Sequence, residues 1–286
     1  MTAKAPTKTD KKRLRAHFGL AKIPFSKHMW AGQMYDSQSQ RELRFGLEMW
    51  LDVKGLALVT GPTGVGKSIT LRRFAADLDD NRYAVFNVGS PPATVHGFLR
   101  FLSRRFGLPM RQHSADLFDA AQRFLVGHEQ EHGTHPLLIL DDAEGLYPDV
   151  ADALRRLTIY DLDAEDRFSI LVSGIESLLQ ILELGVLEPL RSRFSFAQAL
   201  RPFGLEDTRN YIRFHLERAD GDKDLFSDDA VRRVFQASQG RPRSINQLCI
   251  NAMILAAVHG RDQIDGDFVK SLVATNPLFQ YLGAER

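Results

Sequence analysis

The feature that most limits the folds open to this chain is a glycine loop with the sequence Gly61-Pro62-Thr63-Gly64-Val65-Gly66-Lys67-Ser68. The segment before it, residues 55–60, is short and apolar, as in a buried strand. Residues 68–78 after it have helical spacing. Glycines let consecutive backbone N–H groups turn toward one anion, and the positive end of the following helix points at the same place. Strand, loop and helix in this order predict a phosphate-binding site.

The loop also carries the side chains that a triphosphate needs. Its pattern is G-x-x-x-x-G-K-S, in which Lys67 is expected to reach the β and γ phosphates and Ser68 to offer its hydroxyl to Mg²⁺. The glycines do not follow the spacing of a dinucleotide fingerprint. We therefore expect a nucleoside triphosphate to contact residues 61–68 and the next residue, Ile69.

A second motif places acids directly after an apolar run. Residues 137–140 are apolar and are followed by Asp141, Asp142 and, two residues later, Glu144. The carboxyl end of a central parallel strand is where ligands bind in such sheets. Asp141 is expected to hold Mg²⁺ through water, and Asp142 or Glu144 to orient the attacking water. Asp142 is one methylene shorter than the glutamate of many ATPases, which predicts slow hydrolysis.

The rest of the chain predicts an α/β domain and then a helical one. Strand patterns at residues 83–88, 137–140 and 168–173 alternate with helical stretches, which predicts a parallel sheet covered by helices. A helix over residues 37–51 should bury Leu43, Leu47 and Trp50.

From about residue 201 only helical patterns remain. They cover residues 206–218, 227–239 and 244–259, with a fourth helix from residue 265 and Ser227 as an N-cap. The expected organisation is a basic disordered tail (1–16), an α/β nucleotide-binding domain (17–200) and a small all-α lid domain (201–286).

Composition narrows the class of protein. The chain has 286 residues, of which 44% are hydrophobic, and its 37 Lys and Arg nearly balance 36 Asp and Glu, so no whole-protein signature of nucleic-acid binding exists. Its one cysteine, Cys249, excludes an intrachain disulfide and a Cys-rich zinc site, which fits a reducing, cytoplasmic location. No apolar stretch reaches the roughly 20 residues of a membrane span, and the start lacks a secretory signal. The basic tail is read as a solubilising arm or, alternatively, as a contact to phosphates.

One local basic face stands out. Residues 98–106 have helical spacing that turns phenylalanines inward and Arg100, Arg104 and Arg105 outward, and Arg111 extends this region with His96 and His113. The face is either simply solvated or, repeated in an oligomer, able to follow DNA phosphates. His128 and His132 are spaced i, i+4 without further ligands, which predicts an exposed polar helix end and no metal site.

The order of these motifs, continued by Ser173, Arg191-Ser192-Arg193-Phe194 and Gly240-Arg241-Pro242-Arg243, resembles an AAA+ ATPase over residues 17–275. Within AAA+ the chain is most similar to the ExeA-like group, which includes transposition ATPases of the TniB and TnsC kind. The similarity to this group rests on Phe18-Gly19-Leu20, Pro24-Phe25, Asp141-Asp142-Ala143 and Pro242-Arg243-Ser244-Ile245-Asn246.

The resemblance implies roles for individual residues. Ser173 would be sensor 1, Arg243 sensor 2, and Arg193 the finger that reaches the γ-phosphate of a neighbouring subunit, with Arg191 as the competing finger. A guanidinium suits these tasks because it stays charged and can contact two phosphate oxygens. Exposed basic turns are the alternative reading of all three arginines. Asp142, and Ser173-Gly174-Ile175 in place of a Gly-Gln pair, depart from the pattern of the relatives.

The function implied by this resemblance is an assembly switch that uses ATP and Mg²⁺. The homo-oligomer, a ring or a filament, would form with ATP on duplex DNA without sequence specificity and would regulate or recruit a transposase or other client protein. One alternative is an ExeA-like ATPase of a secretion or envelope-assembly system. Another is a nucleotide-gated interaction module with little hydrolysis.

Overall fold

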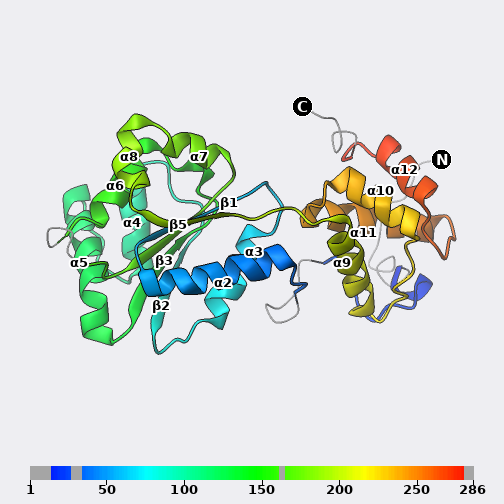
Figure 1. The fold of residues 1–286 in the computed structure, drawn as a ribbon, viewed down its shortest axis with the longest axis horizontal. Coiled ribbons are helices and arrows are strands. Elements are labelled where there is room, and N and C mark those ends of the chain that lie inside the picture. Colours follow the sequence, from blue (N-terminus) through cyan, green and yellow to red (C-terminus); the bar gives the residue numbers. More distant parts are fainter. Residues whose placement is uncertain (1–13, 27–33, 161–164, 280–286) are drawn as a thin grey trace. The chain divides into compact units, whose positions relative to one another are not determined.

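The chain divides into two compact units, which are described separately. The computed structural model describes residues 14–26, 34–160 and 165–279, so most of the expected basic tail, including Lys4, Lys8, Lys11 and Lys12, lies outside the described residues (Figure 1). Residues 38–63 and 67–201 form the sheet unit. The helical unit comprises, among the described residues, 14–26, 34–37, 64–66 and 202–279.

The sheet unit is built on a five-stranded parallel sheet with the order β2-β3-β4-β1-β5. Its strands are β1 (Leu56–Thr60), β2 (Tyr83–Val88), β3 (His135–Leu140), β4 (Ser169–Ser173) and β5 (Phe194–Ala199). Every residue of β1, β3 and β4 is buried. Burial on both faces explains why these strands read as continuous apolar runs. The predicted parallel sheet is confirmed.

Helices cover the two faces of this sheet (Figure 1). They are α2 (Gln38–Val53), α3 (Lys67–Asp77), α4 (Val95–Arg105), α5 (Ser114–His132), α6 (Pro148–Leu157), α7 (Ser177–Leu182) and α8 (Glu188–Arg191). Helices α4 to α8 share one apolar core with the side chains on one face of β1, β3 and β4. The expected buried face of α2 is confirmed, because Leu43, Leu47 and Trp50 are buried.

Strand β5 was not predicted. Its residues alternate between half-buried and exposed, and it pairs only with β1 at the edge of the sheet. An edge strand needs no strongly apolar sequence, so Phe-Ser-Phe-Ala-Gln-Ala gives a weak signal. Gly46 lets α2 pack closely over it, since a Cβ at Gly46 would lie 2.7 Å from Cζ of Phe196.

The helical unit contains the four predicted helices, which lie at α9 (Leu205–Glu217), α10 (Asp228–Ser238), α11 (Pro242–Val258) and α12 (Gly266–Thr275). The predicted N-cap is confirmed, because the Ser227 side chain accepts a hydrogen bond from the Ala230 N–H.

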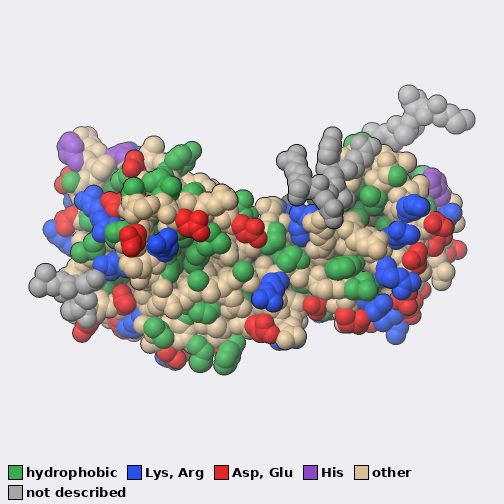
Figure 2. Space-filling view, turned by 45° about the horizontal axis from the view of Figure 1, so that its top comes forward, with side chains coloured by type: hydrophobic (Ala, Val, Ile, Leu, Met, Phe, Trp, Pro, Cys, Tyr) green, Lys and Arg blue, Asp and Glu red, His purple; other side chains and the backbone are tan. Residues whose placement is uncertain are grey.

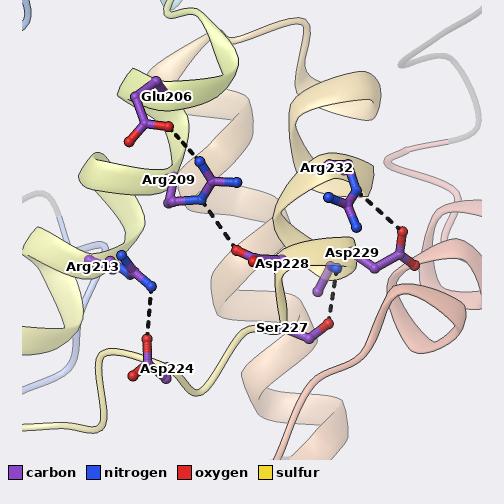
Figure 3. A network of polar contacts seen from close by, with 9 residues as sticks. Glu206, Arg209, Arg213, Asp224, Ser227, Asp228, Asp229 and Arg232 are labelled. Atoms are coloured by element: carbon purple, nitrogen blue, oxygen red, sulfur yellow. Dashed lines mark hydrogen bonds and ion pairs between the residues drawn. The ribbon is translucent and has the colours of Figure 1, made fainter.

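Exposed ion pairs tie α9 to α10 and to the loop between them. Arg209 contacts Glu206 and Asp228, and Arg213 contacts Asp224 (Figure 3). Such pairs contribute about 0–1 kcal/mol each, so the apolar core carries most of the stability of this unit.

Residues near the start of the chain also belong to the helical unit, although a boundary near residue 17 with the α/β domain was expected. Leu20 and Phe25 lie in its core. The Phe25 N–H donates to Nδ1 of His215 (3.3 Å), and the Tyr35 hydroxyl donates to Asp207 (2.8 Å). Burial lowers the pKa of His215 to about 4, so its ring is neutral at pH 7 and can accept this hydrogen bond.

Gly240 marks the tightest backbone approach in the helical unit and gives a test of its packing. The Phe203 N–H donates to the Gly240 carbonyl (2.9 Å), and a Cβ at Gly240 would lie 2.0 Å from the Phe203 carbonyl oxygen. We expect Gly240→Ala to lower the free energy of unfolding, measured by urea denaturation, by well over the ~1–2 kcal/mol of left-handed strain alone. Gly260→Ala is the control, because Gly260 has a similar φ (+63° against +68°) and open space around it. Equal losses in the two variants would contradict the steric explanation.

Candidate functional site

The predicted phosphate loop connects β1 to α3 and depends on glycine at three positions. Gly61, Gly64 and Gly66 have φ values of 147°, 80° and 110°, which other residues adopt only with strain. Helix α3 then begins at Lys67. The loop therefore ends at a helix N-terminus whose N–H groups have no partner within the helix.

Lys67 is held above this loop. Its side chain is buried, and Nζ donates to the carbonyl oxygens of Gly61 (2.8 Å) and Pro62 (3.3 Å). The next residues, Ser68 and Ile69, are half-buried. The ammonium group is thus fixed next to the backbone that would surround a phosphate.

The sheet order brings two further predicted residues level with each other. Strand β4 lies between β1, which leads into the loop, and β3, which leads into the acids. Ser173 pairs in register with Val59 of β1, and Val172 pairs with Leu140 of β3. Asp141, which follows Leu140, is therefore the neighbour of Ser173 at the carboxyl ends of the strands.

Both of these side chains carry a buried polar atom without a partner. Oδ1 of Asp141 and Oγ of Ser173 make no hydrogen bond to any of the described residues. An unsatisfied buried polar group costs about 1–3 kcal/mol. Two such unsatisfied atoms side by side at the carboxyl edge of a parallel sheet lower the stability of the fold. Both are suited to binding a polar ligand.

The other two acids take different positions. Asp142 is exposed and has a left-handed backbone (φ 52°), and Glu144 is half-buried in the 3₁₀ turn Ala143–Gly145. Neither carboxylate has a partner among the described residues that fixes it. The geometry thus leaves both available as the group that orients water.

The predicted arginines differ in their surroundings. Arg191 ends α8, is exposed and has no ion pair or hydrogen bond in the described part of the chain, whereas Arg193 is half-buried and already interacts within its own chain. Arg243 is exposed near the start of α11. Within the helical unit, to which residues 64–66 belong, the Arg243 N–H donates to the Gly64 carbonyl (3.2 Å).

The arginines of α4 point outward as predicted. Arg100, Arg104 and Arg105 are exposed, while Phe98 and Leu102 on the opposite side of the helix are buried. The Arg105 guanidinium lies 5.2 Å from the ring centroid of Phe101. Arg111 is also exposed, and none of the four forms an ion pair with a described residue.

The expectation of an exposed helix end at His128 and His132 was wrong for His128. That ring is buried beside Phe124, and its centroid lies 4.3 Å from the stacked His132 ring. Burial lowers the pKa of His128, with a smaller contribution from His132. Across residues 14–26, 34–160 and 165–279, no group of three or more His, Cys, Asp or Glu is arranged to hold a metal ion.

One candidate was missed as a site residue. Oδ1 of Asn246 in α11 is buried without a hydrogen-bond partner among the described residues. The available signal was its spacing, because Asn246 lies three residues after Arg243 and so on the same side of the helix.

Comparison with known families bears directly on the segment that holds the loop, Asp141 and Ser173. Residues 51–182 match the AAA domain. Over 253 residues the chain is 28% identical to the General secretion pathway protein A of Aeromonas hydrophila, covering 86% of this chain and 45% of that protein. The chain thus spans less than half the length of this relative.

Solved structures agree on the fold. Cdc6p from Pyrobaculum aerophilum has a TM-score of 0.65 at 19% identity, covering 87% of this chain and 69% of that one. The RuvB Holliday junction branch migration motor of Thermotoga maritima has a TM-score of 0.54 at 22% identity, with coverages of 84% and 70%. At these identities the likeness concerns the fold alone, which is a five-stranded parallel sheet covered by helices and followed by a helical part.

The AAA domain implies a nucleotide with Mg²⁺, and the residues present fit the metal. Mg²⁺ prefers oxygen ligands, which the Ser68 hydroxyl and the Asp141 carboxylate supply from neighbouring parts of one sheet edge. The buried Oδ1 of Asp141, which lacks a protein partner, supports this fit.

In the described ranges no helix is both long and apolar enough to cross a bilayer.

The two serines of β4 give a matched test of the candidate site at the carboxyl ends of the strands. Ser169 and Ser173 are equally buried, but Ser169 Oγ lies 3.0 Å from Nε2 of His135 and Ser173 Oγ has no partner. We expect Ser173→Ala to lower ATP turnover about tenfold or more and to raise the free energy of unfolding by up to about 1–3 kcal/mol, because it removes a buried hydroxyl that has no partner. Ser169→Ala should do the opposite, losing about 1–3 kcal/mol of stability with normal turnover. A Ser173 variant that is destabilised but turns over ATP normally would make this residue structural.

Proposed function

We propose that this chain assembles with further copies when it binds ATP with Mg²⁺, and that slow hydrolysis of the ATP takes the assembly apart. The observation that carries the proposal is the pair of unpartnered buried atoms, Asp141 Oδ1 and Ser173 Oγ, at the sheet edge that also carries the phosphate loop. The match to the AAA domain supports it.

The chain's own groups divide the chemistry. The loop N–H groups and Lys67 hold the phosphates, Ser68 and Asp141 hold the metal, and Ser173 positions the reacting group. Mg²⁺ supplies neutralisation of phosphate charge when it is bound. Asp142 or Glu144 orients the attacking water. The short, exposed Asp142 favours slow turnover, and an ATP-gated interaction module with little hydrolysis remains the alternative within this class.

A second copy of the chain completes the site in this proposal. An arginine that stabilises transferred charge in a neighbour must be exposed and free of local partners. Arg191 meets both conditions and Arg193 meets neither fully, so we now prefer Arg191, although the sequence favoured Arg193. We assign Arg243 the role of sensing the nucleotide from the helical unit.

For the process, we propose duplex DNA as the surface on which copies assemble, with a transposase as the client, in the cytoplasm. The support is local charge, because residues 81–115 contain no Asp or Glu and include Arg82, Arg100, Arg104, Arg105 and Arg111. Such segregation in a nearly neutral chain suits contacts to phosphates without sequence reading.

A second process has its own support. The similarity to General secretion pathway protein A favours a role in secretion or envelope assembly. In that case the client would be a protein, and the basic face of α4 would be a solvated surface.

ATP turnover at increasing protein concentration tests the assembly mechanism. We expect Lys67→Ala to lose the stabilisation by Mg²⁺-ATP that binding gives the wild type, about 2.7 kcal/mol at a hundredfold excess over Kd. Arg191→Ala should keep that stabilisation but lose the rise of specific turnover with concentration, because only the neighbour's contribution is removed. Lys270→Ala, an exposed lysine of α12, is the control. Normal, concentration-dependent turnover in the Arg191 variant would refute the assignment, and binding without turnover in the wild type would support the gated module.

Binding to random-sequence duplex DNA, with and without ATP and over a range of salt, separates the two processes. We expect ATP-dependent binding that weakens as salt rises, and a salt slope that falls by about one for each of Arg100→Ala and Arg104→Ala. The matched control is Arg123→Ala, since Arg123 is exposed on α5 but paired with Asp119. Absence of DNA binding with intact ATP turnover would favour the secretion reading.

A further inference from the structure

The outer edge of the sheet at β5 is open. Strand β5 pairs with β1 on one side only, and its other side has no strand among the described residues. Its sequence contains no charge and no proline to protect this edge, and its one irregularity is a register shift near its start, opposite Leu56 and Ala57. Ala197 and Ala199, on the face of β5 turned away from α2, are exposed and small, so side chains of β5 itself do not crowd this edge. The N–H and C=O groups that β5 directs away from β1 therefore have no strand partner among the described residues.

Helix α2 presents an apolar stripe beside this edge. Phe45, Met49 and Val53, spaced at i, i+4 and i+8, have exposed fractions of 63%, 49% and 67%. Figure 2 shows hydrophobic side chains along the lower margin of the sheet unit, where α2 lies. Three large apolar side chains on one face of one helix are more than the isolated exposed residues normal on a protein surface.

The positions of other α2 residues place the stripe relative to β5. Gly46 and Trp50 face β5, because Gly46 packs on Phe196 and the Trp50 Nε1–H donates to Ser195 Oγ (3.1 Å). Gln40 lies on the side toward α3, where its Nε2 donates to Thr70 Oγ1 (3.2 Å). At about 100° per residue, Phe45, Met49 and Val53 fall on the far side of the β5 contact from Gln40. Val53 and Met49 thus lie toward the place where a sixth strand would lie, and Phe45 continues the stripe on the side of α2 that points away from the sheet.

The charged residues around the stripe indicate what kind of partner could bind there. Glu42, Glu48 and Asp52 are exposed on the same helix, against one exposed arginine, Arg41. Glu48 and Asp52 have no ion pair with a described residue. Carboxylates that border an apolar stripe favour a partner with basic side chains, through attraction and through rejection of acidic segments.

We propose that β5 and the stripe of α2 bind an extended segment of a partner protein, which adds to the sheet as a sixth strand. Its backbone pairs with the free edge of β5, its apolar residues on alternate positions face Val53 and Met49, and basic residues stand between them. This mode of recognition takes affinity from main-chain hydrogen bonds and specificity from alternate side chains. It requires no nucleotide and uses none of the residues of the ATP site.

A ten-residue peptide that alternates valine and lysine, labelled with a fluorophore, is the probe, and its anisotropy is measured with the full chain in the absence of nucleotide. A peptide of the same composition with the valines and lysines in two blocks controls for charge alone. We expect the alternating peptide to bind and the block peptide to bind at least tenfold more weakly. Val53→Ser should weaken the alternating peptide about tenfold, by removing a buried valine contact. Val186→Ser is the matched control, since Val186 is 71% exposed elsewhere on the sheet unit.

Backbone pairing is tested by methylating the peptide nitrogens of either all valines or all lysines. In a strand, alternate residues direct their N–H groups to opposite edges, so one set faces β5 and the other faces solvent. We expect one methylated peptide to lose binding and the other to keep it. Equal effects of the two methylations, no binding of the alternating peptide, or equal effects of the two serine variants would each overturn the proposal. Loss of self-association in Val53→Ser, seen by sedimentation, would replace the partner segment by a second copy of the chain.

Discussion

The site depends on the position of one strand. Because β4 lies between β1 and β3, the end of β4 is level with the phosphate loop on one side and with the acidic motif on the other. A parallel sheet directs all its carboxyl ends to one edge, so side chains far apart in the sequence meet there without long loops. The apolar core beneath keeps these strands fully buried, and in that packing Asp141 Oδ1 and Ser173 Oγ have no hydrogen-bond partner among the described residues.

The parts of the fold with strong local signals could be predicted from the sequence. The buried strands, the glycine loop and the four C-terminal helices each carry a period or a punctuation that is set within a few residues. Strand β5 could not be found in this way, because an edge strand is stabilised by its pairing with β1 and by Phe196 against Gly46, both distant in sequence. The same holds for His128, whose ring packs against Phe86 of β2 as well as against Phe124 of its own helix.

For the candidate site, the sequence could supply residue types and not their surroundings. Asp141 and Ser173 were both candidates, but the absence of any partner for their buried atoms is a property of the packed sheet. Arg191 and Arg193 are two residues apart and chemically identical. Only the end of α8 and the start of β5 distinguish them, because one side chain is left in solvent and the other lies against its own chain.

The docking of the first described residues onto the helical unit has a consequence for how the chain is made. Residues 14–26 and 34–37 share a core with α9 to α12, so the sheet unit is inserted, in sequence terms, into the helical one. During synthesis Phe25 leaves the ribosome long before His215 and the helices that cover it. The apolar side chains of residues 14–26 therefore stay uncovered until α9 to α12 have emerged, while the sheet unit can fold in between.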